Sequence, residues 1–324
     1  MKKIILSILV ICPIVMHAQF DGIVGTAGCK AIHCKDARII EWALNCEVVR
    51  GYQNIAKPQD GYASYGTENA AIGRVEDGNT GNAVSLGDSG VAILTFQTPI
   101  VNGEGYDFAV FENSLSDDFL ELAFVEVSSD GMHYFRFPAT SNTPNDVQIG
   151  NSGSVDATLI NNLAGKYRVG WGTPFDLEEL PEDDNLDKNN ILYIKIIDVI
   201  GTINPLYASL DAQGNIINDP YPTNFPSSGF DLTGVGVLNN KNNTSISQHD
   251  EFVVSVYPNP CNGFVFVYAD ECDLSLYNSL GQLLHQQNRI QNTSKLDMSA
   301  YPEGVYFIHL QNNQTRKSIK IIKQ

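Results

Sequence analysis

Short alternating apolar runs, separated by glycine, proline, asparagine and aspartate, limit most strongly what this chain can form. Residues Phe124–Phe137 contain two such runs around Asp130-Gly131, a pair that is typical of a β-hairpin turn. Further strands are expected at Val91–Thr98 before Pro99, Tyr106–Glu112, Ile191–Ile200 and Phe230–Leu238. Helix signals are few: Asp36–Leu44 and Asp156–Leu163 could each form two turns with aspartate as N-cap. The pattern predicts an all-β fold, a jelly-roll-like β-sandwich.

The first 18 residues read as a secretory signal peptide. Lys2 and Lys3 precede the apolar run Ile4–Val15, and Ala18 is a small residue suited to cleavage before Gln19. This run is too short to span a membrane, and no other run approaches the ~18 apolar residues that a transmembrane helix requires. We therefore expect export through the periplasm and no transmembrane segment.

Charge divides the exported part of the chain. Residues 21–250 hold 12 Lys and Arg against 31 Asp and Glu, a net charge of −19, whereas residues 251–324 hold six of each. An acidic body repels phosphate backbones, which excludes nucleic acid as a partner and favours divalent cations. The polar stretch 239–250 has no apolar period and reads as a linker between a body, 19–238, and a second domain, 251–324.

Carboxylates within apolar runs point to a bound cation. Asp198 lies inside an apolar strand and Glu112 ends another, and an ionised carboxylate buried without a partner costs several kcal/mol. Arg136, Arg168, backbone amides or Ca²⁺, which binds six to eight oxygen ligands, could compensate. Candidate calcium ligands near predicted strand ends are Asp107, Glu112, Asn113, Asp198 and Asp231.

Five cysteines follow the signal peptide, and export favours disulfides. Cys261 and Cys272 flank one strand and its return, which predicts a Cys261–Cys272 bond. We also predict Cys29–Cys46, which leaves Cys34 unbridged. The alternative is a metal site formed by Cys29, His33, Cys34 and Cys46, although this spacing does not match a zinc ribbon or finger.

Three aromatic residues in a glycine-rich segment, Tyr167, Trp171 and Phe175, are candidates for a sugar-binding platform. The alternative is aromatic packing over the end of a sheet.

The last part of the chain carries an ordered series of motifs. VYPNP (256–260) is followed by a strand bounded by Gly263, then LSLYNSLGQLL (274–284), LDMSAYPEGVYFIHL (296–310) and the basic strand KSIKIIK (317–323). Residues 251–324 thereby resemble the C-terminal sorting domain of type IX secretion cargo. The resemblance implies a small Ig-like sandwich, recognition by the type IX machinery, and a location outside the cell, secreted or attached to its surface.

The body carries a second resemblance. GYDFAVFENS (105–114), FVEVSSDGMHYFRFP (124–138), LAGKYRVGWGTPFDL (163–177) and GFDLTGVGV (229–237) resemble a family of bacterial cell-surface β-sandwich proteins of unestablished activity. Some members accompany outer-membrane nutrient receptors, which implies ligand capture or a receptor partner but assigns no catalytic residue.

The sequence therefore predicts a non-catalytic binding protein that captures a carbohydrate or other nutrient. The alternatives are a calcium-dependent glycan hydrolase or lyase, and a structural surface protein.

Removal of Glu251–Gln324 should leave a soluble, folded body in the periplasm, because the polar linker shares little core with either side. Fractionation followed by immunodetection tests this expectation. Normal appearance of the truncated chain in the medium would contradict the sorting assignment.

Overall fold

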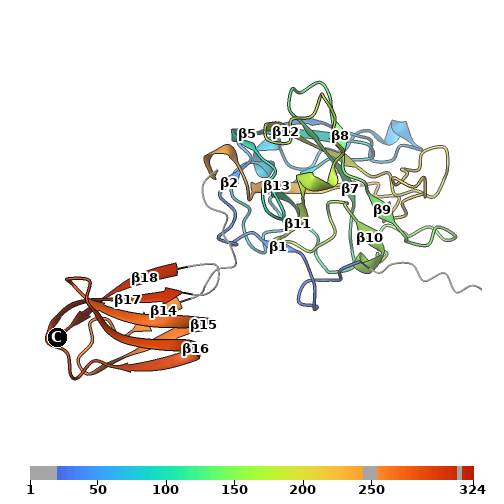
Figure 1. Ribbon diagram of the computed structural model, residues 1–324. Helices are drawn as coiled ribbons and strands as arrows, with labels where there is room; N and C mark the ends of the chain where they lie inside the picture. The colour runs from blue at the N-terminus through green and yellow to red at the C-terminus, as the bar shows by residue number, and fades with distance from the viewer. Residues whose placement is uncertain (1–19, 244–253, 312–315) are drawn as a thin grey trace, which may run out of the picture. The chain divides into compact units, whose positions relative to one another are not determined.

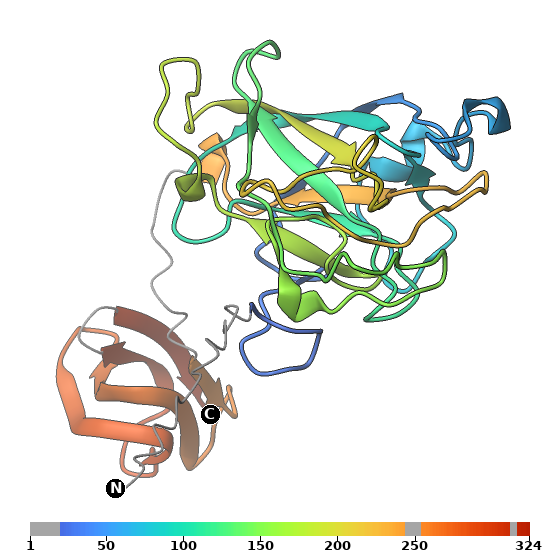
Figure 2. The same ribbon diagram turned by 90° about the vertical axis from the view of Figure 1, so that its right-hand side faces the viewer.

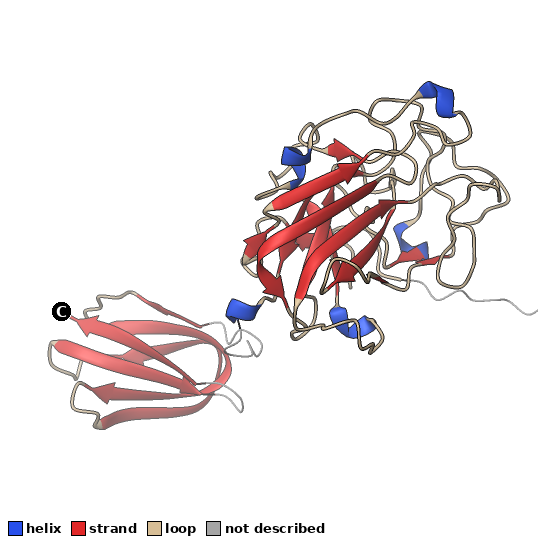
Figure 3. Ribbon diagram, turned by 90° about the horizontal axis from the view of Figure 1, so that it is seen from above, coloured by secondary structure: helices blue, strands red, loops and turns tan. Residues whose placement is uncertain are grey.

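The computed structural model describes residues 20–243, 254–311 and 316–324 (Figure 1). The predicted signal peptide lies outside these residues. The chain divides into two compact units, Met1–Ser245 and Ile246–Gln324, and each is described by itself. Strands dominate both units and the helices are single short turns (Figure 3), which confirms the all-β sandwich.

The body contains two main antiparallel sheets. One has the order β1-β11-β6-β13-β2, with β4 also paired to β13. Its strands are β1 (Ile32–His33), β11 (Trp171–Phe175), β6 (Phe108–Glu112), β13 (Asp231–Val237), β2 (Glu41–Trp42) and β4 (Val84–Ser85). The other sheet has the order β3-β5-β12-β7-β8. Its strands are β3 (Asn45–Val49), β5 (Val91–Ile100), β12 (Ile191–Asp198), β7 (Ala123–Ser128) and β8 (Phe135–Arg136). A separate pair joins β9 (Thr140–Ser141) to β10 (Ile160–Asn161).

Local sequence signals explain several elements. The predicted hairpin is present: β7 pairs with β8, and Asp130 accepts the amide N–H groups of Met132 and His133 in the turn. The expectation that Pro99 stops a strand was wrong, since β5 continues to Ile100.

The two predicted two-turn helices are also absent from the described body. Asp156 does cap a helix, but this is the single 3₁₀ turn η3 (Ala157–Leu159), and 36–44 forms a turn followed by β2. The other 3₁₀ turns are η1 (Pro58–Asp60), η2 (Glu68–Ala71), η4 (Leu177–Glu179) and η5 (Lys241–Asn243).

Strand alternation builds more than one core layer. Phe108 and Val110 of β6 face the central core between the sheets, whereas Ala109 and Phe111 face a smaller cluster outside it. Strand β13 satisfies the same two-sided burial with glycine: a Cβ on Gly234 would lie 2.8 Å from Val75 Cγ2. Strands β6 and β13 are therefore covered on both faces, and the segments that cover them are part of the fold.

The predicted linker begins within the body. The Asn239 side chain donates to Asp107 Oδ1 at 2.9 Å, and Asn240 is buried and donates to Glu41 Oε2 at 2.8 Å. Residues 244–250 lie outside the described part of the chain.

The second unit is one five-stranded antiparallel sheet with a buried core of its own. Its strands are β14 (Val254–Tyr257), β15 (Phe264–Asn278), β16 (Leu283–Asp297), β17 (Gly304–Gln311) and β18 (Arg316–Lys323). Strand β15 pairs with β14 in its first half and with β17 in its second half, and irregularities in its pairing with β16 separate the two halves.

The VYPNP motif ends strand β14 and forms hydrogen bonds with strand β18. Strand β14 ends at Tyr257, as expected from a following proline. The amide of Asn259 then donates to Lys320 O at 2.9 Å and accepts the Ile322 N–H at 2.9 Å. This side chain therefore substitutes for a neighbouring strand along the edge of β18.

Neither predicted disulfide is formed within the described residues, and these predictions were wrong. Cys261 pairs with Lys323 at one end of β18. Cys272 is next to Asp273, which pairs with Gln311 of β17. Gln311 in turn pairs with Arg316 at the other end of β18. At about 3.3 Å per residue, the two ends of β18 are roughly 20 Å apart. The Cα atoms of a disulfide lie only about 4.4–6.8 Å apart.

Cys29 and Cys46 are separated in a similar way. Cys46 pairs with Leu94 in the second sheet, whereas Cys29 follows a turn in the N-terminal loop, next to Lys30, which bonds Asp21.

Replacing Phe175 with alanine should destabilise the body by about 3–5 kcal/mol, because a buried phenylalanine leaves a cavity. Its ring stacks on Phe108 at 5.4 Å and packs on Phe137 at 4.9 Å. Urea unfolding monitors the loss. Met132→Ala, at a side chain that is 76% exposed, should change stability by less than about 0.5 kcal/mol. Equal effects of the two substitutions would contradict the observed core.

Candidate functional site

Most of the predicted metal-binding residues lie at one end of the body. Glu112 ends β6, Asn113 follows it, Asp231 begins the antiparallel neighbour β13, and Asp198 ends β12 of the other sheet. Asp107 is not with them, because it precedes β6 and therefore lies at the opposite end of that strand. There it accepts three N–H groups, from Gly103, Leu177 and the side chain of Asn239.

The strand-end carboxyls bind local donors. Asp198 accepts the N–H groups of Phe230 at 2.7 Å and Ser89 at 3.1 Å. Glu112 accepts the Ser114 N–H at 2.6 Å. Asp231 accepts the Ser85 hydroxyl and, at 3.1 Å, the side-chain amide of Asn113.

Three further carboxyls at this end were missed by the sequence reasoning: Asp88, Glu121 and Asp219. Asp88 accepts the Ile55 N–H at 2.6 Å, and Asp219 accepts the Leu122 N–H at 3.0 Å. The signal that marked Asp198 could also have found Glu121, since both interrupt apolar runs. We call the six residues Asp88, Glu112, Glu121, Asp198, Asp219 and Asp231 the carboxylate cluster; all are buried.

Burial governs the acidity of this cluster. Desolvation raises the pKa of Asp88 and of Asp231 to about 6. It raises the pKa values of Glu112, Glu121, Asp198 and Asp219 well above their ordinary range, and neighbouring carboxyls add to the shifts. The carboxyls of the cluster therefore resist ionising together: they either keep protons or need cations to neutralise their charge.

No lysine or arginine of the described residues forms an ion pair with the cluster. The arginines that the sequence offered as partners are used elsewhere: Arg136 pairs with Glu126 and Arg168 with Asp117. Backbone amides are the compensating groups that the structure does supply.

The predicted aromatic platform is not formed. Phe175 is 1% exposed in the central core, and Tyr167 is buried with its hydroxyl donated to Asp21. Trp171 is half-buried and packs edge-on against His33 at 4.6 Å. The packing alternative describes these residues better.

Other aromatic rings are exposed on two loops above the carboxylate cluster. Tyr52 and Tyr62 stack with ring centroids 4.7 Å apart, and Tyr62 is 56% exposed. Phe225, on the second loop, is 51% exposed. We call residues 51–66 and 221–228 the aromatic loop pair; Figure 2 shows these light-blue and gold segments at the same end of the body.

Hydrogen bonds fix the aromatic loop pair in place. The Asn54 side chain donates to Asn224 Oδ1 at 2.9 Å, and the Ser64 N–H donates to Pro226 O at 2.8 Å. Tyr52 forms a β-bridge with Asp88, so the first loop is also joined to the carboxylate cluster.

His33, Cys34 and Asp77 form the one group of three metal-ligand side chains within 4.8 Å of one another in the described residues. This group shares His33 and Cys34 with the predicted cysteine-rich site but replaces Cys29 and Cys46 with Asp77. Its members already have partners: Asp77 bonds Lys35 Nζ at 2.9 Å, and His33 Nδ1 accepts the Lys35 N–H. The arrangement reads as a surface ion-pair network beside Trp171.

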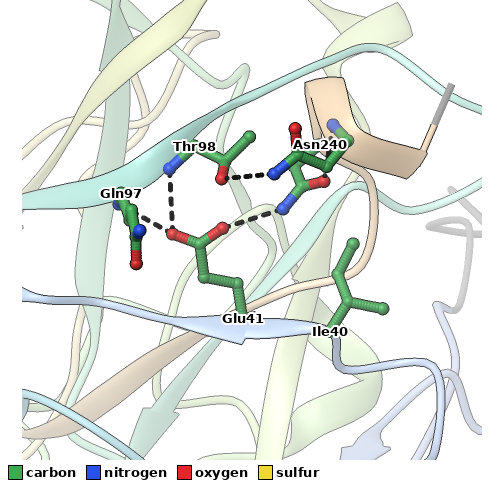
Figure 4. Close-up of a pocket in the computed structure, with 6 residues that line it drawn as sticks. Ile40, Glu41, Gln97, Thr98 and Asn240 are labelled. Carbon is green, nitrogen blue, oxygen red and sulfur yellow. Dashed lines mark hydrogen bonds between the residues drawn. The ribbon is translucent and has the colours of Figure 1, made fainter.

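An open polar pocket of about 400 Å³ lies where the body chain leaves toward residue 244 (Figure 4). Glu41 holds its wall together, accepting the N–H groups of Gln97 at 2.7 Å and Thr98 at 3.0 Å and the side-chain amide of Asn240. These polar groups already bond one another, and Glu41 thereby joins Asn240 to Gln97 and Thr98 of β5.

Residues 255–324 match the family model described as the secretion system C-terminal sorting domain. This segment is a type IX sorting domain. The protein is therefore exported by type IX secretion and is released or held at the outer cell surface. No helix in the described residues is long and apolar enough to cross a membrane.

Solved structures similar to this chain include PorZ, a surface component of the type IX system of Porphyromonas gingivalis. It has 20% identity over 28% of this chain and 14% of that chain, with a TM-score of 0.22. A biofilm-associated protein BSP domain has 11% identity over 72% and 48%, with a TM-score of 0.19. A Lactobacillus rhamnosus β-glucuronidase has 10% identity over 87% and 43%, with a TM-score of 0.24.

The chain spans less than half of each of these three structures. At these TM-scores we infer nothing from them about the body. A comparison with curated proteins finds no match.

Replacing Asp88 with asparagine should remove a pH-dependent loss of stability. A carboxyl whose pKa is raised by folding stabilises the protein below its unfolded pKa, and this contribution is lost as pH rises through the folded value. For a pKa of about 6 in the folded state, the loss between pH 4 and pH 7 is about 2 kcal/mol. The charge of Asp88 also helps to raise the pKa values of Asp198 and Asp219.

Urea unfolding in chelator at pH 4 and pH 7 measures this difference. The stability of Asp88→Asn relative to the original protein should increase with pH. A difference that stays constant with pH would show that Asp88 titrates normally.

Proposed function

We propose that this protein is an exported, non-catalytic binding protein whose body captures a carbohydrate with the aromatic loop pair. The observation that carries the proposal is the exposure of Tyr62, which stacks on the half-buried Tyr52, and of Phe225 on two loops that hydrogen bonds hold together. Exposed rings on fixed loops offer apolar faces to sugar rings with little loss of conformational entropy.

Polar groups surround these rings. Gln53 follows Tyr52 in the first loop, and the exposed Asn224 precedes Phe225 in the second. A ligand with apolar faces and many hydroxyl groups suits this combination, since ligand sites pair an apolar surface with a few placed polar groups.

The state of the carboxylates favours binding over hydrolysis. A glycosidase needs two carboxyl groups that face a substrate cleft. In the carboxylate cluster the side chains are buried, and Asp198, Asp219 and Asp88 are bonded to backbone amides.

A panel of soluble polysaccharides, screened by affinity electrophoresis with the full chain, tests the proposal. At least one polysaccharide should slow the migration of the protein. Tyr62→Ala or Phe225→Ala should weaken the binding of that polysaccharide about tenfold, the effect of losing roughly 1.4 kcal/mol of ring contact. Met132→Ala is the matched control, because this exposed apolar side chain lies on the hairpin at the other end of β7.

If no polysaccharide slows the protein, carbohydrate capture is refuted and a structural role is favoured. If a polysaccharide slows all variants equally, binding lies outside the aromatic loop pair.

A further inference from the structure

His33, Cys34 and Asp77, which form the ion-pair network beside Trp171, bring three different kinds of donor atom together. An imidazole nitrogen, a thiol sulfur and a carboxylate oxygen all lie within 4.8 Å of one another. A tetrahedral metal ion with ligand bonds of about 2.0–2.3 Å holds its donor atoms about 3.3–3.6 Å apart. His33 Nε2 and Asp77 Oδ1 are already 3.4 Å apart, a separation that suits a shared ion better than a direct hydrogen bond.

The first strand of the body fixes two of these side chains. His33 ends β1 opposite Trp171 of β11, and the two rings pack at 4.6 Å. Cys34 follows, with its N–H bonded to Gly170 O at 2.9 Å and its side chain buried in the apolar cluster that contains Val75. Packing and a main-chain hydrogen bond therefore hold the imidazole and the thiol in place.

The third side chain comes from the loop that follows η2. Asp77 lies two residues after the buried Val75, and its side chain is 38% exposed. Gly170 leaves room for this carboxylate, because a Cβ on Gly170 would lie 2.8 Å from Asp77 Oδ1. The second oxygen, Oδ2, accepts a proton of Lys35 Nζ at 2.9 Å. One oxygen therefore faces His33 while the lysine orients the other.

The donor set selects among metal ions. Calcium and magnesium prefer ligands that are all oxygen, whereas a thiolate and an imidazole suit zinc. Zinc binds cysteine, histidine and aspartate side chains, and a site with three protein ligands keeps a water molecule in the fourth position. The thiolate and the carboxylate together balance the two positive charges of Zn²⁺.

The surroundings of Cys34 favour a metal ligand over a nucleophile. A reactive cysteine has a lowered pKa and an accessible sulfur. Burial and the charge of Asp77 raise the pKa of the Cys34 thiol, although Lys35 and Arg74 oppose them, and the residue is 0% exposed. It forms no disulfide within the described residues. A zinc ion would displace the thiol proton and bind the thiolate directly.

One weak hydrogen bond opposes zinc binding. His33 Nδ1 accepts the Lys35 N–H at 3.2 Å, so the proton of the neutral ring lies on Nε2. Zinc at Nε2 requires that proton to move to Nδ1, which breaks the bond to Lys35. Because Lys35 is exposed, its N–H can bond water instead, and the loss is small.

We propose that His33 Nε2, Cys34 Sγ and Asp77 Oδ1 bind one zinc ion, with water as the fourth ligand. The ion joins the end of β1 to the loop that follows η2. Its open side is the exposed side of Asp77, through which zinc enters and leaves.

Zinc binding is measured by isothermal titration on the full chain, produced without a polyhistidine tag, treated with chelator and kept reduced. The expected result is one zinc ion per chain and the release of about one proton, from the Cys34 thiol. Co²⁺ in place of zinc should give the near-ultraviolet absorption band of a metal–thiolate bond.

Two pairs of variants test the ligands. Asp77→Asn should weaken zinc binding at least tenfold, since even the outer partners of metal ligands contribute that much. Glu76→Gln removes the neighbouring exposed carboxylate of the same loop and should leave zinc binding unchanged. Cys34→Ser should abolish the cobalt–thiolate band, whereas Cys29→Ser should keep it.

Absence of zinc binding by the original chain would overturn the proposal, and so would unchanged binding by Asp77→Asn. Binding of cobalt without a thiolate band would place the ion away from Cys34 and reject the assigned site. Asp77 lies on an exposed turn, so this test does not depend on a substitution in the core. None of these measurements involves polysaccharide binding, and the zinc and carbohydrate proposals can fail separately.

Discussion

The burial of negative charge without positive side chains is the constraint on which the loop-bearing end of the body depends. Each amide-bonded carboxyl takes an N–H from a different segment: Asp88 from Ile55, Asp219 from Leu122, and Asp198 from Ser89 and Phe230. A loop amide that leaves a sheet needs an acceptor, and water does not reach these positions. The carboxylates supply the acceptors and thereby gather the loops at one point.

The same principle operates at the opposite end of the sandwich. Asp107 binds the N–H groups of Gly103 and Leu177 and the side chain of Asn239, tying the end of the body to a loop and to a 3₁₀ turn. Part of the strong acidity of the body therefore has an internal structural role. Glu121 stands apart because it carries the cost of burial without taking part in this amide binding.

Strands could be predicted from the sequence more completely than site residues, for physical reasons. The hairpin of β7 and β8 could be predicted because alternation and an Asp-Gly turn are local signals. Sheet partners depend on contacts between distant segments, so Asp107 and Glu112 were grouped although β6 separates them. The aromatic platform failed for a similar reason: nothing within the sequence around Phe175 tells a core ring from an exposed one. Glu121 carried the same signal as Asp198 and could have been found.

The two hydrogen bonds between the Asn259 side chain and the main chain of β18, which we call the Asn259 clasp, have a consequence for how the sorting domain can vary. The two hydrogen bonds of this side chain go to main-chain atoms, the Lys320 carbonyl and the Ile322 amide. Such a contact recognises the path of a strand and is indifferent to the side chains that the strand displays. Arg316, Ser318 and Lys320 on its exposed face can therefore be exchanged without disturbing the clasp. Cargo proteins can thus share one domain architecture and still differ on this outward strand.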